Sequence, residues 1–379
     1  MESSLQCSPE QLALLQLSLT EGIGPVTAKA LIEELGSALA VMSATPTELM
    51  KHPNIRPKLA QMLLSGNGVE LAKRELETLE ELQQRGHPLQ LYFLGDDTYP
   101  PYLAQCFDAP LVLYVKGQIP SGPMISFVGT RRNTHYSIDV LEYLMEGIAT
   151  LRPDITIVSG LAYGVDKLSH QAALKYGLKS IGVVAHGHYT LYPSSHRNLA
   201  EQMIATGGGI VTEYSYHTRA LPQRFVQRNR IVAGLSLGTI VVESAERGGS
   251  LITANIAFDY GRSVFAAPGR IFDPASKGCN KLIAHQKASI ITTPDKLLEE
   301  LQLLPTLTPK RLPFEEEEEE QEETNPILIA LRTSDHLTLE DLALQIGEDV
   351  PTISGMLFEL ELNGQIHSLP GGRYCIKNH

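Results

Sequence analysis

Residues 124–134 read MISFVGTRRNT: an apolar run that ends at Val128 is followed at once by a glycine, a threonine and two arginines. Six more short runs rich in β-branched residues follow, separated by about 15–25 residues that hold a helical pattern. They are 155–158, 180–184, 209–212, 239–242, 263–266 and 289–291. Strands with few polar positions, alternating with helices, are typical of a parallel sheet covered on both faces. The sequence therefore predicts a doubly wound α/β core over residues 120–300.

The loop after Val128 is the expected ligand site, because open α/β sheets bind ligands beyond the carboxyl ends of strands, where strand order reverses. A dinucleotide site would need G-x-G-x-x-G here, and one glycine with two arginines stands instead. Glycine lets the backbone approach an anion, threonine offers a hydroxyl, and arginine forks onto phosphate oxygens. We expect Gly129, Thr130 and Arg131 to bind a phosphate, with no cofactor; a structural turn with solvated arginines is the alternative.

A second basic cluster opens a predicted helix at residues 224–230, which read RFVQRNR. Arg224 and Arg228 are i,i+4 neighbours, so their guanidinium groups would share one helix face. Phe225 adds a ring on which an unpaired base could stack. This combination favours single-stranded nucleic acid, and the alternative places Phe225 in the core with the arginines solvated. The candidate residues here are Arg224, Phe225, Arg228, Asn229 and Arg230.

A glycine turn at residues 248–249 opens another predicted helix, whose amino end could hold a phosphate or a ribose. Its candidate residues are Gly249, Ser250 and Thr253. Glu243 ends the preceding strand, and an acid beside an anion site also permits an enzymatic interpretation. By contrast, the G-x-S-x-G at 234–238 runs from helix to strand, the wrong order for a nucleophile elbow.

The histidines and cysteines give little support to a metal site. His186, His188 and His196 lack a nearby acidic or thiol ligand in the sequence. The four cysteines lie far apart without a C-x-x-C pair, so we expect reduced thiols. No metal and no cofactor are predicted.

Charge is distributed unevenly along the 379 residues, whose net charge is -12. Residues 121–290 carry 17 basic and 11 acidic side chains, whereas residues 301–379 carry 5 and 15. The predicted core is therefore the segment suited to a polyanion. No signal peptide and no apolar run of about 18 residues is present, so a cytoplasmic location without a membrane span is expected.

The flanks predict two small domains. Helical patterns over 9–19 and 26–32, joined by Gly22-Ile23-Gly24-Pro25, resemble a helix-hairpin-helix, which could contact DNA or serve only as a packed connector. An acidic stretch that includes Glu315 to Glu320 predicts a disordered linker, which could be a solvated spacer or a phosphate-mimicking tail that competes with nucleic acid for the basic core. Three helical segments and a hairpin around Gly371-Gly372 then predict a winged helix.

Seven motifs, in this order, resemble the DNA-processing protein A family (DprA, also called Smf). They are Val128-Gly129-Thr130-Arg131, residues 159–166 with His170, Tyr192-Pro193, Phe225 with Arg228-Asn229-Arg230, residues 249–254, Pro268-Gly269, and residues 278–280 with Leu282-Ile283. The likeness is strong from Tyr99 to Leu298. It departs at residues 185–188, where the family usually has a small residue before the glycine and an acid after it, and at Arg132.

The resemblance implies an extended Rossmann-like core that binds single-stranded DNA, forms a homodimer and loads the RecA recombinase in natural transformation or DNA recombination. By motif, Gly129, Thr130 and Arg131 would hold a phosphate, Arg228 and Arg230 would line the strand beside Phe225, and Gly249, Ser250 and Thr253 would close the pocket. Lys277, before the last motif, joins this DNA-binding set.

Two functions from different classes follow. The first is a DNA-binding mediator without catalytic turnover, and the second is a phosphoribohydrolase-like enzyme that would use Glu243. The expected domains are a helical domain over 1–85, the core over 86–303, the acidic linker over 304–325 and the winged helix over 326–379. Leu282 and Ile283 suggest a dimer contact with a RecA surface nearby; the alternative is that both pack inward on the sheet.

Overall fold

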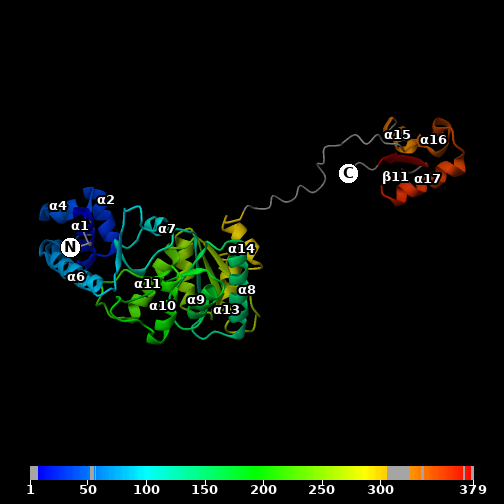
Figure 1. Cartoon of the computed structure of the whole chain (residues 1–379). Coiled ribbons are helices and arrows are strands. Elements are labelled where there is room, and N and C mark those ends of the chain that lie inside the picture. The colour runs from blue at the N-terminus through cyan, green and yellow to red at the C-terminus, as the bar shows by residue number, and fades with distance from the viewer. Residues whose placement is uncertain are drawn as a thin grey trace. The chain divides into compact units, whose positions relative to one another are not determined.

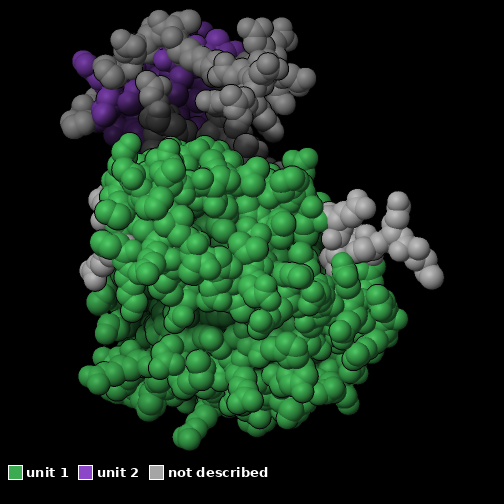
Figure 2. Space-filling model, turned by 90° about the vertical axis from the view of Figure 1, so that its left-hand side faces the viewer, with its two compact units in different colours: residues 1–306 green, residues 307–379 purple. Residues whose placement is uncertain are grey.

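The computed structural model describes residues 7–51, 55, 57–304, 325–333, 337–369 and 372–376. The chain forms two compact units, 1–306 and 307–379 (Figure 2). The expected acidic linker, 304–325, lies outside the described residues apart from its two end positions. The boundary expected near residue 85 falls inside the first unit and stays a prediction.

The first unit is built on one nine-stranded sheet with the order β1-β2-β6-β5-β4-β3-β7-β8-β9. In this order, every neighbouring pair in the run β6-β5-β4-β3-β7-β8-β9 is parallel. Strands β1 and β2 add an antiparallel edge beside β6. The strands are β1 (Gln90–Phe93), β2 (Val112–Gly117), β3 (Met124–Gly129), β4 (Thr156–Ser159), β5 (Lys179–Val183), β6 (Gly209–Thr212), β7 (Gly238–Glu243), β8 (Ser263–Ala266) and β9 (Ser289–Ile290). The predicted doubly wound, mostly parallel sheet is confirmed, and its strand order reverses between β3 and β7.

Helices cover both faces of the sheet (Figure 1). Ile125 and Phe127 of β3 point into one layer, while Val128 points into the other, because successive strand residues alternate in direction. The first layer contains α8 (His135–Leu151), α9 (Val165–Lys175) and α14 (Pro294–Glu300). The second contains α7 (Pro101–Ala104), α11 (Pro222–Gly234), α12 (Ser250–Asp259) and α13 (Lys277–Ala284), and α10 (Arg197–Ala205) packs near β5 and β6.

Six helices before the sheet gather beside its β1–β2 edge (Figure 1). They are α1 (Pro9–Leu19), α2 (Pro25–Leu35), α3 (Ala38–Ser43), α4 (Pro46–Leu49), α5 (Pro57–Leu64) and α6 (Asn67–Gln84). The predicted break between the first two is present: Gly22 has φ +80° and Pro25 opens α2. Their apolar faces share a core with Phe93 and Tyr114 of the edge strands.

The second unit has its own core, which includes Leu342, Ile353 and Leu357. Its elements are α15 (Pro326–Thr333), β10 (Leu337–Thr338), α16 (Leu339–Ile346), α17 (Val350–Leu362), β11 (Ile366–Leu369) and β12 (Arg373–Ile376). Three helices with a small β10-β12-β11 sheet form the predicted winged helix.

The two residues expected at a dimer contact face the core of the first unit. Leu282 is buried in the layer that contains α13, and Ile283 is half-buried against the same cluster. Packing on the sheet therefore buries most of the apolar surface that was expected at the dimer contact. No helix within the described residues is long and apolar enough to cross a membrane.

Candidate functional site

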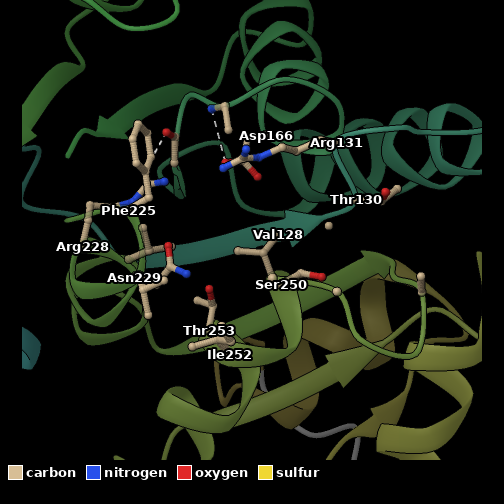
Figure 3. Close-up of a pocket in the computed structure, with 18 residues that line it drawn as sticks. Val128, Thr130, Arg131, Asp166, Phe225, Arg228, Asn229, Ser250, Ile252 and Thr253 are labelled. Carbon is tan, nitrogen blue, oxygen red and sulfur yellow. Dashed lines mark hydrogen bonds between the residues drawn. The ribbon is translucent and has the colours of Figure 1, made fainter. Parts of the chain in front are cut away.

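A cavity of about 260 Å³ lies where β3 and β7 end, at the point of strand-order reversal (Figure 3). Three loops, the first turns of α9 and α12, and residues 225–232 of α11 surround it. Its lining residues are Val128, Gly129, Thr130, Arg131, Gly160, Ala162, Asp166, Phe225, Val226, Arg228, Asn229, Val232, Ala245, Gly248, Gly249, Ser250, Ile252 and Thr253. The structure thus places a pocket at the edge that the sequence indicated.

The β3–α8 loop is held in place by one hydrogen bond to the end of β7 and one within the loop. The Thr130 N–H donates to the Glu243 carbonyl at 2.8 Å, and the Thr130 hydroxyl accepts from the Arg132 N–H at 3.1 Å. A Cβ on Gly129 would lie 2.5 Å from the Val165 side chain, so this glycine permits close packing on α9. The close approach that requires glycine at this position is therefore to the Val165 side chain.

Arg131 is the exposed cation of the pocket. Its guanidinium carbon lies 5.9 Å from the centre of the Phe225 ring, which meets the Tyr192 ring edge-to-face at 5.6 Å. Within the described part of the chain its guanidinium has no hydrogen-bond or ion-pair partner. The side chain is therefore available to bind an anion beside an aromatic ring.

Arg228 has a different role from the one that its sequence position suggested. It is only 3% exposed, and its Nη1 donates to the carbonyl oxygens of Gly160, at 2.5 Å, and Val183. A Cβ on Gly160 would lie 2.3 Å from this nitrogen, so the glycine makes room for the guanidinium. The alternative of a solvated arginine on the helix surface is therefore wrong for Arg228, which ties α11 to the loop after β4 and to the last residue of β5 beneath the pocket.

Arg224 and Arg230 lie outside the pocket lining. Arg224 donates to the Arg219 carbonyl and lies over the Tyr214 ring at 5.1 Å. Arg230 pairs with Glu213 and donates to the Asp108 carbonyl at 2.6 Å. The expected shared arginine face therefore does not form, because the three guanidinium groups of this cluster find separate partners.

The amino end of α12 closes the opposite side of the pocket (Figure 3). The Ser250 hydroxyl donates to the Ser244 hydroxyl at 2.9 Å, and Thr253 is buried beside it. The N–H groups of Gly249 and Ser250 have no acceptor among the described residues. Unpaired amides at a helix amino end, together with the helix dipole, form an anion site.

Asp166 is a pocket residue that our site prediction omitted, although it belongs to one of the quoted motifs. Its carboxylate accepts from the Ala162 N–H at 3.3 Å. Burial raises the pKa of this carboxyl, and the neighbouring Arg228 acts in the opposite direction. Its position in the first turn of α9, directly after the loop that follows β4, is the signal that could have found it, because that loop shares the carboxyl edge of the sheet with the loop after β3.

Glu243 does not line the pocket. Its carboxylate accepts from the Thr134 N–H at 2.9 Å and from the Thr134 hydroxyl at 2.7 Å, so both oxygens hold the first residue of the α8 cap. The side chain is buried. This arrangement supports a structural role and leaves no carboxylate oxygen aimed at a substrate.

The three histidines considered for a metal each contact the backbone. His186 accepts from the Tyr192 N–H at 3.1 Å, and His188 and His196 bond the carbonyls of Tyr114 and Leu161 at 3.0 Å. No group of three metal-ligating side chains is present in the part of the chain that the structure describes.

Nine of the twelve predicted binding residues line the pocket: Gly129, Thr130, Arg131, Phe225, Arg228, Asn229, Gly249, Ser250 and Thr253. Besides Arg224 and Arg230, the lining excludes Lys277, which is exposed at the start of α13. The structure also adds Asp166 and Ile252, which the sequence prediction lacked.

Comparison with known proteins covers each part of this architecture. Residues 90–302 match the family model of DNA recombination-mediator protein A, 312–372 match the DprA winged helix domain, and 13–66 match the SAM-like helix-hairpin-helix tandem. The helix-hairpin-helix and winged-helix predictions thus agree with these matches.

Relatives and a solved structure agree with that match. Protein Smf of Escherichia coli (strain K12) is 37% identical over 298 residues, covering 77% of this chain and 78% of that protein. DNA processing protein DprA of Bacillus subtilis (strain 168) is 42% identical over 211 residues, covering 55% and 70%. The X-ray structure of DNA processing protein A from Streptococcus pneumoniae aligns with a TM-score of 0.64 and 29% identity, covering 78% of this chain and 99% of that one. With a matched model over more than half its length, this chain belongs to the DNA recombination-mediator protein A (DprA/Smf) family.

Proposed function

We propose that this protein binds single-stranded DNA in the pocket between β3 and β7 and acts as a mediator of DNA recombination in natural transformation. In this role it protects the strand and loads the RecA recombinase. Family membership supports the connection to DNA processing. The binding site is argued from the pocket itself.

One observation carries the proposal: the pocket joins an unpartnered guanidinium, an aromatic ring and unpaired helix amides. Arg131 and the N–H groups of Gly249 and Ser250 suit a phosphate, and Phe225 beside them suits a base. A duplex keeps its bases stacked inside, so only an unpaired strand can offer a phosphate and a bare base face to this one site.

The enzymatic alternative has less support. A phosphoribohydrolase-like reaction would use Glu243, and both oxygens of that carboxylate are occupied by Thr134. The remaining acid of the pocket, Asp166, lies next to Arg228 and accepts a backbone N–H. An assay for ribose release from nucleoside monophosphates tests this alternative directly: release by the wild type that Glu243→Gln abolishes would favour the enzyme.

The decisive experiment compares fluorescently labelled single-stranded and duplex oligonucleotides by anisotropy with the full chain, at low and physiological salt. We expect tighter binding of the single strand and a loss of affinity with salt, because arginine contacts release counterions from the DNA. Equal or tighter binding of the duplex would overturn the proposed site.

RecA loading and the homodimer are proposed from the family alone. For loading, RecA filament formation on single strands coated with a competing binding protein should accelerate when this protein is added. For the dimer, light scattering of the full chain should give twice the mass of the 41.5 kDa chain. A monomer mass at the protein concentrations used for DNA binding would contradict the proposed homodimer.

A further inference from the structure

We propose that bound single-stranded DNA extends from the pocket toward β6 and stacks its bases on aromatic side chains along the carboxyl edge of the sheet. We call this surface the aromatic track; it consists of Tyr192, Tyr189, Tyr216 and His217. The inference rests on the proposed function, since it assigns a path to the same strand.

Sheet topology places the track beside the pocket. Strands β3, β4, β5 and β6 are parallel neighbours, so the loops that follow them leave the same edge. Tyr189 and Tyr192 lie in the loop after β5, and Tyr216 and His217 lie in the loop after β6. Three strand spacings of about 4.8 Å separate β3 from β6, so the loop after β6 lies about 15 Å from the pocket.

Direct ring contacts connect the pocket to the track. Phe225, which lines the pocket, meets Tyr192 at 5.6 Å between ring centres. Tyr189 meets Tyr216 at 5.8 Å and His217 at 4.9 Å. Tyr189 is 63% exposed and Tyr192 is 53% exposed, although rings of this size are usually mostly buried. His217 is exposed as well and Tyr216 is half-buried, so the rings form two groups: Phe225 with Tyr192, and Tyr189 with Tyr216 and His217. Exposed rings of this kind are the platform that sequence-independent strand binding uses.

The two loops that carry the track are anchored at their bases. The His188 Nε2 bonds the Tyr114 carbonyl at 3.0 Å, which ties the β5 loop to β2. The Glu75 carboxylate of α6 accepts from the Tyr216 N–H at 2.6 Å, which ties the β6 loop to the N-terminal helices. The Tyr189 N–H donates to the Tyr216 carbonyl at 3.0 Å and joins the two loops. The rings are therefore held in place before a strand arrives, which lowers the entropic cost of binding.

Basic side chains accompany the rings. Lys116 and Arg197 line a small cavity with Tyr189 and Glu201. Burial raises the pKa of the Tyr216 hydroxyl, and the nearby charge of Arg85 opposes that effect. Cations beside an aromatic row suit a polyanion whose bases stack. This charge favours the DNA strand over an apolar protein segment as the occupant.

The chain has no tryptophan, so a single introduced indole reports on its own surroundings. In Tyr189→Trp the ring keeps its stacking capacity, and binding of an oligo-dT of about 15 nucleotides, followed in parallel by anisotropy, should quench its fluorescence. The matched control is Phe107→Trp: Phe107 is also 63% exposed, meets Tyr260 just after α12, and belongs neither to the pocket lining nor to the track. Its fluorescence should stay unchanged.

A second measurement gives the effect on affinity. Replacing Tyr189 and His217 together by alanine should weaken binding of the oligo-dT of about 15 nucleotides by about tenfold, since each lost stack removes a measurable share of the binding energy, and Phe107→Ala should not. Strand binding without quenching in Tyr189→Trp, or unchanged affinity in the double alanine variant, would contradict the aromatic track. Either result would leave the proposed binding site in the pocket unaffected. If the wild type binds no single strand at all, the proposed function fails and the track fails with it.

Discussion

Two arginine-bearing regions of this protein look alike in sequence and differ in the structure. The loop at residues 129–134 and the start of α11 at residues 224–230 each combine arginines with polar residues near the predicted ligand edge. Arg131 of the first region is exposed and unpartnered within the described residues, whereas Arg228 of the second is buried against two carbonyl oxygens. The first arginine is free to bind a ligand, and the second holds the site together.

The comparison shows how the direction of a side chain decides its role. A loop that leaves the end of a strand points outward, so an arginine there meets solvent or ligand. One face of a helix that covers a sheet must point inward, and Arg228 lies on that face with Ile231 and Val232. An inward guanidinium has to find acceptors, because a buried unpaired charge costs several kcal/mol.

The largest expected difference between the two regions is in stability. Arg228→Ala should lower the free energy of unfolding by about 3–5 kcal/mol, because it leaves the buried Gly160 and Val183 carbonyls without their donor and removes a cation beside Asp166. Arg131→Ala should change it by less than about 0.5 kcal/mol. Urea titration of both variants checks this, and Arg228→Lys should lose less than Arg228→Ala. Equal stabilities for the two alanine variants would contradict the assigned roles.

The next effect concerns binding. Arg131→Ala should weaken single-strand affinity about tenfold and reduce the slope of log K against log salt by about one, as expected for one lost phosphate contact. Arg132→Ala is the matched control, because Arg132 is the exposed neighbour that does not line the pocket. Anisotropy over a salt series gives both quantities. A similar loss in the two variants would show that the loop acts through diffuse charge.

A smaller effect should come from the acid that lies between these regions. Glu243→Gln keeps the shape of the side chain but weakens the two contacts with Thr134 at the start of α8, so we expect a loss of about 1 kcal/mol in stability. Single-strand affinity should stay within about twofold. Thermal unfolding and anisotropy measure the two outcomes. A large loss of single-strand affinity with unchanged stability would show instead that Glu243 takes part in binding.

The smallest expected effect is a few-fold change that depends on pH. At neutral pH the Asp166 carboxylate repels a bound phosphate, so Asp166→Asn should bind single strands a few-fold more tightly. Because burial raises the pKa of Asp166, this carboxyl gains a proton at a higher pH than an ordinary aspartate. Wild-type affinity should therefore rise toward the variant's as the pH falls from 7. A gap between the two proteins that stays constant down to pH 4 would contradict this assignment.

The sequence alone determined the parallel sheet, its reversal point and the residues at its carboxyl edge. Apolar runs such as 125–128 and 239–242 have few polar positions because both faces are buried, and the loop after Val128 follows from that pattern. The small flanking domains were also predictable, since Gly-Pro at residues 24–25 and three helical segments before a hairpin are local signals.

Only the tertiary structure decided which polar side chains face the ligand. Arg228, Arg230 and Glu243 are polar residues near the site in sequence, and each is used by a partner distant along the chain: Gly160, Glu213 and Thr134. Asp166 reaches the pocket from the first turn of α9, and Tyr189 meets Tyr216 across loops that follow different strands. Local patterns determine where strands and helices begin, but a hydrogen-bond partner far away in the chain depends on how the layers pack, so the sequence could not separate binding residues from structural ones.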